Sequence, residues 1–113
     1  MANHRVTVFT NSKEGREQDF KDWYTNTHLA EVANLDGFVS GQLFTLATPV
    51  AEGGHRHMAV YEIEEGKMGD AQKALGAALS TGALQMTDAF GPGQAALWWN
   101  EESPVVARDA AAV

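Results

Sequence analysis

The chain has 113 residues, of which 44% are hydrophobic, and it carries a formal charge of −7 and no cysteine. This length favours one domain, and the scattered lysines and arginines argue against a nucleic-acid partner. Without a run of ~20 apolar residues, we expect no membrane span. The absence of cysteine excludes disulfides and thiolate metal sites and is compatible with a reducing cytoplasm, the expected location.

The first half of the chain predicts a strand followed by a helix. Residues 5–11 are rich in β-branched side chains, which favour a strand. Ser12 is the predicted N-cap of a helix, because apolar residues then recur every three or four positions from Phe20 to Leu35. The poor helix formers at positions 25–27 predict a break or bend, with a short second helical turn through Val32.

The second half predicts two strands, a helix and a last strand. The strands are expected at 38–46, 55–63 and 94–100, and the apolar stripe from Met68 to Leu79 predicts the helix. The resulting order is βαββαβ. This order predicts an α+β, ferredoxin-like domain over residues 1–102, with a four-stranded antiparallel sheet and both helices on one face. Residues 103–113 are expected to form a flexible tail.

Large apolar side chains point to both faces of the predicted sheet. Neighbours on a strand alternate between faces, so Trp98 and Trp99 lie on opposite sides, as do Val60 and Tyr61. Helices on one face would leave the other apolar patch in water, which monomers rarely tolerate. We therefore expect a homodimer that packs two sheets face to face.

The chain resembles the EthD-like family of dimeric α/β barrels. The residues that carry this pattern are Asn11, Gly15, Phe20, Trp23, Tyr24, His28, Val32, Gly37 and Phe38. Tyr61-Glu62 and Thr87-Asp88-Ala89 are similar to its weaker later motifs. The resemblance implies a ferredoxin-like dimer, and relatives include polyketide cyclases, cofactorless monooxygenases, isomerases and proteins without assigned activity. One departure is Leu43, which stands where a basic residue is common, so an anion contact there is not expected.

His28 and Tyr24 are the predicted catalytic residues. Phe20, Tyr24 and His28 are spaced four apart and share one helix face. Imidazole gains and loses its proton near neutral pH, which suits a general base. Tyr24 would donate a hydrogen bond to a substrate oxygen. The alternatives are a structural histidine at the end of the helix and a core tyrosine.

Eight further residues are predicted to bind substrate. They are Asn11, Phe9, Trp23, Phe44, His57, Tyr61, Asp88 and Trp98. The aromatic members would form pocket walls, and His57 would add a polar group facing Tyr61. Asp88 would orient a histidine, and Asn11 would offer its amide to a ligand or cap the helix. His55 and His57 share a strand face, but no third ligand follows at metal-site spacing, so we expect no metal and no cofactor.

These residues favour a cofactor-independent enzyme with a pocket between the sheet and the first helix. Its substrate would be a small apolar carbonyl or aromatic, polyketide-like compound, and its reaction a cyclisation, isomerisation or elimination. The alternatives are a cofactorless monooxygenase and a non-catalytic, ligand-binding accessory dimer. Both alternatives would use the same aromatic walls.

Overall fold

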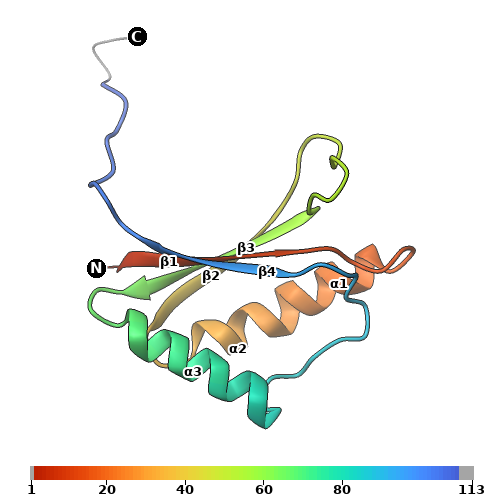
Figure 1. Ribbon diagram of the computed structural model, residues 1–113, viewed down its shortest axis with the longest axis horizontal. Coiled ribbons are helices and arrows are strands. Elements are labelled where there is room, and N and C mark those ends of the chain that lie inside the picture. The colour runs from red at the N-terminus through yellow and green to blue at the C-terminus, as the bar shows by residue number, and fades with distance from the viewer. Residues whose placement is uncertain (1, 110–113) are drawn as a thin grey trace.

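The computed structural model describes residues 2–109 (Figure 1). The elements are β1 (Ala2–Thr10), α1 (Glu17–Trp23), the π-helical turn η1 (Tyr24–His28), α2 (Leu29–Ala33), β2 (Phe38–Thr45), β3 (His57–Glu64), α3 (Met68–Thr81) and β4 (Ala95–Asn100). They follow the predicted order, with α1, η1 and α2 forming one continuous helical segment. Among these residues, no helix is long and apolar enough to cross a membrane.

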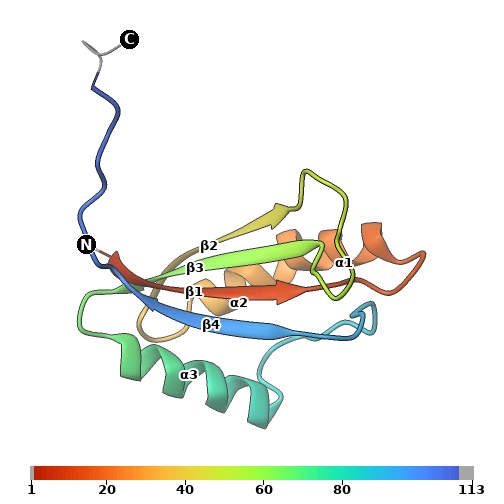
Figure 2. The ribbon, with the colours of Figure 1, turned by 45° about the horizontal axis from the view of Figure 1, so that its top comes forward.

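The four strands form one antiparallel sheet in the order β2-β3-β1-β4. Both helical segments cover the same face of this sheet, and the other face is left open (Figures 1 and 2). The arrangement confirms the predicted α+β, ferredoxin-like fold. In the centre, Val6 on β1 lies opposite Tyr61 on β3 and Trp98 on β4.

The hydrophobic core fills the space between the sheet and the helices. Strand alternation sends Val6, Tyr61 and Ile63 toward the helices, and all three are almost fully buried. Phe20 and Val32 meet them from the helical side. The residues of the sheet that alternate with these, such as Trp99, point to the open face, where Trp99 is 50% exposed. Trp98 and Trp99 therefore lie on opposite faces, as predicted.

The predicted break at positions 25–27 takes the form of the π-helical turn η1. A π turn accommodates one extra residue without ending the helix. Thr25 contributes by donating its hydroxyl to the carbonyl of Lys21 at 2.9 Å. Tyr24 and His28, at the two ends of this turn, are both buried. The irregular segment therefore keeps both predicted catalytic side chains on the protein side of the helix.

The prediction that Ser12 caps the first helix was wrong. The helix begins at Glu17 with Arg16 at its N-cap, and Ser12 instead forms an antiparallel bridge with Phe90. The adjacent Lys13 amide donates to the carbonyl of Ala89 at 2.7 Å. Pairing with the segment before β4 therefore extends the strand-like backbone beyond β1 and delays the helix.

Candidate active site

A cavity of about 300 Å³ lies between the sheet and the helices. It is lined by Val8, Thr10, Tyr24, His28, Val32, Tyr61, Leu75, Leu79, Met86, Phe90, Gln94, Ala95 and Ala96. Most of these side chains are apolar, and the volume is at the lower end of the ~300–1,000 Å³ range of small-molecule sites. Leu79 and Met86 are each 53% exposed, so the cavity opens between the end of α3 and the loop that follows it.

Three polar atoms in the wall of this cavity are buried without a hydrogen-bond partner. They are Thr10 Oγ1, His28 Nδ1 and the hydroxyl oxygen of Tyr61. Leaving such a group unsatisfied costs ~1–3 kcal/mol, so folded proteins seldom retain several together. Three such atoms on residues that line one cavity make it a candidate site for water or the polar groups of a ligand.

The His28 ring is packed between two aromatic side chains. It stacks on Trp23 with ring centres 4.4 Å apart and meets the ring of Tyr24 edge-on at 5.0 Å. Burial lowers the pKa of His28 from 6.5 to about 4, and the nearby Glu31 carboxylate offsets only part of this effect. The imidazole is therefore neutral at pH 7, and its residue is part of the cavity lining.

The two tyrosines keep their protons at neutral pH. Burial raises the pKa of Tyr24 to about 12, an effect that the Tyr61 hydroxyl partly offsets. Burial and, to a smaller extent, Tyr24 raise the pKa of Tyr61 well above its ordinary value. The Tyr24 and Tyr61 hydroxyls lie close enough to affect each other's pKa, but Tyr61 forms no hydrogen bond of good geometry with the protein. An oxygen in the cavity would therefore compete with Tyr24 for the Tyr61 proton.

The structure brings three of the predicted site residues into this cavity and places two more nearby. Tyr24, His28 and Tyr61 line it. Trp23 lies behind His28 and supports that ring without lining the cavity. Trp98 is half-buried against the hydrophobic core, also outside the lining. What these five residues do stays a prediction.

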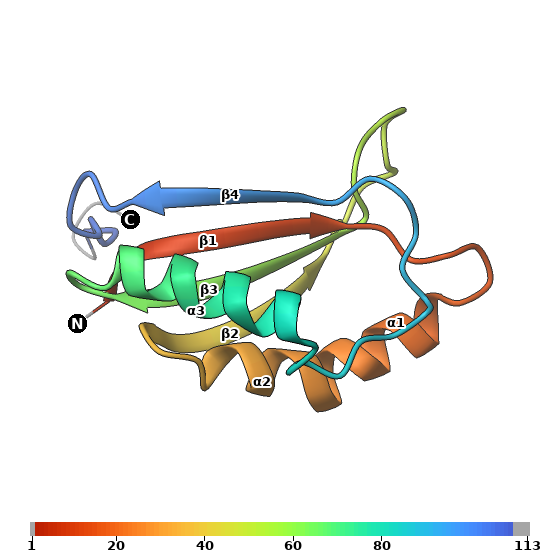
Figure 3. The ribbon, with the colours of Figure 1, turned by 60° about the horizontal axis from the view of Figure 1, so that its bottom comes forward.

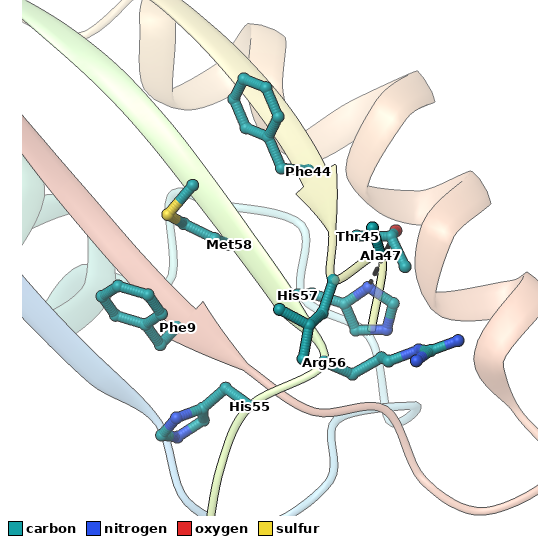
Figure 4. Close-up of a pocket in the computed structure, with 9 residues that line it drawn as sticks. Phe9, Phe44, Thr45, Ala47, His55, Arg56, His57 and Met58 are labelled. Carbon is teal, nitrogen blue, oxygen red and sulfur yellow. Dashed lines mark hydrogen bonds between the residues drawn. The ribbon is translucent and has the colours of Figure 1, made fainter. Parts of the chain in front are cut away.

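Phe9 and Phe44 cannot line the cavity with His28, so their predicted place was wrong. Both lie on the open face of the sheet, because strand alternation turns them away from Val8 and Thr10. There they line a second hollow of about 230 Å³ near the β2–β3 loop (Figure 4).

Asn11 and Asp88 are engaged in contacts away from the cavity. The Asn11 amide donates to the carbonyl of Gly54 and accepts from the backbone amide of Arg56, at 3.2 and 2.9 Å. It anchors the β2–β3 loop and does not cap the helix. Asp88 forms a 2.9 Å ion pair with Arg16, so it does not orient a histidine as predicted.

His57 is buried, and it lines the second hollow rather than the cavity. Its Nδ1 lies 3.4 Å from the Thr45 hydroxyl, its ring packs 5.0 Å from Phe20, and its Nε2 has no partner. Burial lowers its pKa. The His57 ring points away from the His55 ring (Figure 4). His55 instead contacts the carbonyl of Gly93. Within residues 2–109, no three histidine or acidic side chains cluster as metal ligands.

Several lining residues were not predicted from the sequence. They are Val8, Thr10, Val32, Leu75, Leu79, Met86, Phe90, Gln94, Ala95 and Ala96. Strand alternation offers a signal for Thr10, since it shares a face with Val6 and Val8. Met86 and Phe90 come from an irregular loop, where no periodic pattern indicates direction.

Solved structures with the same fold include a haem-degrading protein, an assigned monooxygenase and a protein of the EthD family. The haem-degrading protein MhuD of Mycobacterium tuberculosis, solved with two haems in its active site, has a TM-score of 0.65 and 17% identity, covering 91% of this chain and 99% of its own. An assigned antibiotic biosynthesis monooxygenase of Bordetella bronchiseptica has a TM-score of 0.61 and 15% identity, covering 94% and 100%.

An ethyl tert-butyl ether degradation (EthD) family protein of Bacillus halodurans has a TM-score of 0.52 and 17% identity, covering 89% of this chain and 99% of its own. No protein-family model matches the sequence, and no characterised protein matches it significantly by sequence. The likeness to EthD proteins that the sequence suggested is thus confirmed at the level of the fold. A shared fold does not imply a shared reaction, so the chemistry of this chain depends on its own cavity.

Proposed function

We propose that the protein is a cofactor-independent acid–base enzyme acting on a small apolar carbonyl or aromatic compound. The observation that carries the proposal is the apolar cavity with three unpartnered polar atoms, from Thr10, His28 and Tyr61. Apolar walls favour a hydrophobic ring, and isolated polar groups favour a few oxygen functions on it. The haem-degrading and monooxygenase structures agree with small-molecule chemistry on this fold.

In the proposed reaction, the neutral His28 imidazole takes a proton from a carbon next to the substrate carbonyl. The electrons of the broken C–H bond pass into the carbonyl, which becomes an enolate. Tyr61 or Tyr24 donates a hydrogen bond to the enolate oxygen, since both tyrosines remain protonated. The imidazolium then returns the proton to another position of the substrate. Such a sequence serves cyclisation, isomerisation or elimination.

The low pKa of His28 limits which substrates this base can use. A buried imidazolium is unfavourable even with the Glu31 carboxylate nearby, which is why the pKa falls to about 4 in the free protein. The enolate itself supplies the compensating charge beside the ring. Proton transfer is therefore favoured only when the negative charge forms within the cavity, next to His28.

Proton exchange at a carbonyl compound tests this proposal directly. The bicyclic ketone 2-tetralone combines an aromatic ring, a carbonyl and acidic α-hydrogens. In D₂O, we expect the protein to accelerate replacement of its α-hydrogens by deuterium, as followed by NMR. His28→Gln should fold normally and lower this rate by roughly 10²–10⁴-fold. His55→Gln is the matched control, because His55 borders the second hollow.

The outcomes separate the candidate functions. Full exchange activity in His28→Gln would remove the acid–base role. Saturable binding of 2-tetralone without catalysed exchange would favour the ligand-binding alternative. No binding to the wild-type protein would exclude this substrate class. Oxygen consumption with the bound compound would favour the cofactorless monooxygenase.

We also propose that the protein is a homodimer joined through the open sheet face. Phe44, Leu97 and Trp99 are 42%, 46% and 50% exposed there, and Phe9 and Met58 extend the same surface. Packing two sheets face to face would bury these side chains in a closed two-fold assembly. Light scattering should give about 24 kDa, twice the 12.2 kDa chain, and a stable monomer would contradict the assembly.

A further inference from the structure

The loop from α3 to β4 forms one wall of the cavity and lies beside the first helical segment. Figure 3 shows it leaving the end of α3, passing α1 and then turning into β4. Leu84 anchors the loop in the core, whereas Met86 and Phe90 line the cavity. Met86 is 53% exposed at the opening. Any ligand that enters on this side must pass the loop.

The backbone amide and carbonyl of one loop residue, Gln85, are both hydrogen-bonded to side chains of the helical segment. The Gln85 amide donates to Glu31 Oε1 at 3.0 Å. The Gln85 carbonyl accepts from the indole nitrogen of Trp23 at 2.6 Å. These two side chains lie on either side of His28 in the sequence, and Gln85 directly precedes Met86. The loop is thus fastened to the part of the helix that carries the proposed base.

The same indole also supports the His28 ring. Trp23 stacks against His28 with an angle of 23° between the ring planes. Its nitrogen is fixed by the Gln85 carbonyl, so the indole plane is held at one edge by the loop and along its face by the histidine. A displacement of Gln85 would therefore remove the constraint on both the loop and the ring.

We infer that Trp23 and Glu31 are positioning residues that latch the entrance loop and hold His28 in its orientation. The latch is closed when the Gln85 amide and carbonyl are both bonded, and it opens when the loop leaves these two side chains. Its role in catalysis rests on the proposed function, whereas the latch itself does not. Both bonds lie at the surface, and each contributes about a 2- to 13-fold factor to the closed state. The loop can therefore open without unfolding the core.

Hydrogen exchange of the Gln85 amide tests the Glu31 half of the latch. Glu31→Ala removes the acceptor, so this amide should exchange about 2- to 13-fold faster in D₂O by NMR. Glu31→Gln retains a carbonyl oxygen and should largely restore the slow exchange. Glu14→Ala, an exposed substitution before α1, is the control and should leave the Gln85 amide unchanged. Unchanged exchange in Glu31→Ala would overturn the inference.

The Trp23 half is tested by separating its hydrogen bond from its stacking. Trp23→Phe removes the indole N–H but retains an aromatic ring, so the loop should loosen while the His28 ring resonances shift little. Trp23→Leu should loosen the loop and also shift those resonances. Trp99→Phe, which removes an indole on the open sheet face, should do neither. An undisturbed loop in Trp23→Phe would contradict the latch.

The rate at which 2-tetralone binds connects the latch to the cavity. We expect Glu31→Ala to raise the association and dissociation rates together, because an unlatched loop opens more often. Faster loop exchange with unchanged binding rates would show that the ligand enters elsewhere and would overturn the entrance role. If 2-tetralone fails to bind the wild-type protein, the proposed function fails, while the exchange measurements still decide the latch.

Discussion

The two faces of the sheet differ in how their polar groups are satisfied. On the face toward the helices, Thr10 and Tyr61 bury hydroxyl oxygens that have no partner. On the open face, the Thr7 hydroxyl accepts from the indole nitrogen of Trp99 at 2.8 Å, and Arg5 pairs with Glu62 at 3.7 Å. Burial without partners is costly, whereas exposed groups that pair with one another are not.

This contrast distinguishes a ligand site from a docking surface. The helix-facing side combines enclosure with unused polar atoms, which a small molecule with oxygen functions can satisfy. The open side combines exposed apolar side chains with paired groups such as Thr7 with Trp99 and Arg5 with Glu62, which suits a second protein surface. Successive residues of a strand point to the two faces in turn. A substitution on one face can therefore be tested with little disturbance of the other face.

The largest expected effect comes from placing a charge on the open face. In the proposed dimer, Leu97→Asp would bury an unpaired carboxylate, which we expect to weaken association by about 2–5 kcal/mol. Sedimentation should then show a folded monomer at concentrations where the wild type is dimeric. Gln72→Asp on the exposed side of α3 adds the same charge and should remain dimeric. If Leu97→Asp stayed dimeric, the second copy would have to pack elsewhere.

The next effect is a loss of stability in acid, caused by the helix-facing side. Because the folded pKa of His28 lies near 4 and the unfolded value near 6.5, the unfolded chain binds more protons between these pH values. Stability should therefore be complete above pH 6.5 and fall by about 2–3 kcal/mol as the pH approaches 4. His57 contributes in the same direction, since burial also lowers its pKa.

His28→Gln should reduce the loss of stability between pH 6.5 and pH 4, as measured by urea unfolding at several pH values. His57→Gln should remove a further part of this loss of stability. If the free energy of unfolding fell equally steeply with pH in His28→Gln and in the wild type, the His28 ring would not be desolvated in the folded protein.

A matched pair of substitutions on β1 gives the smallest effect. Thr10→Val removes a buried hydroxyl without a partner and should raise the free energy of unfolding by up to about 1 kcal/mol, while weakening 2-tetralone binding. Thr7→Val removes a bonded hydroxyl on the other face and should lower stability slightly without affecting binding. Thermal unfolding and a binding titration measure both. If the two variants changed stability and 2-tetralone binding equally, the two faces of the sheet would not differ in how their polar groups are satisfied.

The sequence predicted the fold well because the relevant signals are local and periodic. Alternation on β1 and β3, together with the helical spacing of Phe20, Tyr24 and His28, specifies which sides face inward. It also identified the open apolar face. The start of the first helix was missed, because the pairing of Ser12 with Phe90 joins residues far apart in the sequence.

The site was predicted only in part, for a similar reason. Tyr61 lies on a regular strand, and Tyr24 and His28 lie on a helical segment that continues through its π turn, so spacing indicates their directions. Phe9 and Phe44 were placed in the pocket because they are aromatic, although alternation sends them to the open face. The entrance loop has no periodicity, so the contacts of Gln85 with Trp23 and Glu31 required three-dimensional structure.

The location of a bound ligand tests the central claim most directly. With the histidine side chains labelled with ¹⁵N, titration of 2-tetralone should perturb the nitrogen resonances of His28 and the backbone signals of Thr10 and Tyr61. The signals of Phe44 and Met58, around the second hollow, should change little. Perturbations confined to that hollow, with His28 unchanged, would contradict the assignment of the helix-facing cavity as the functional site.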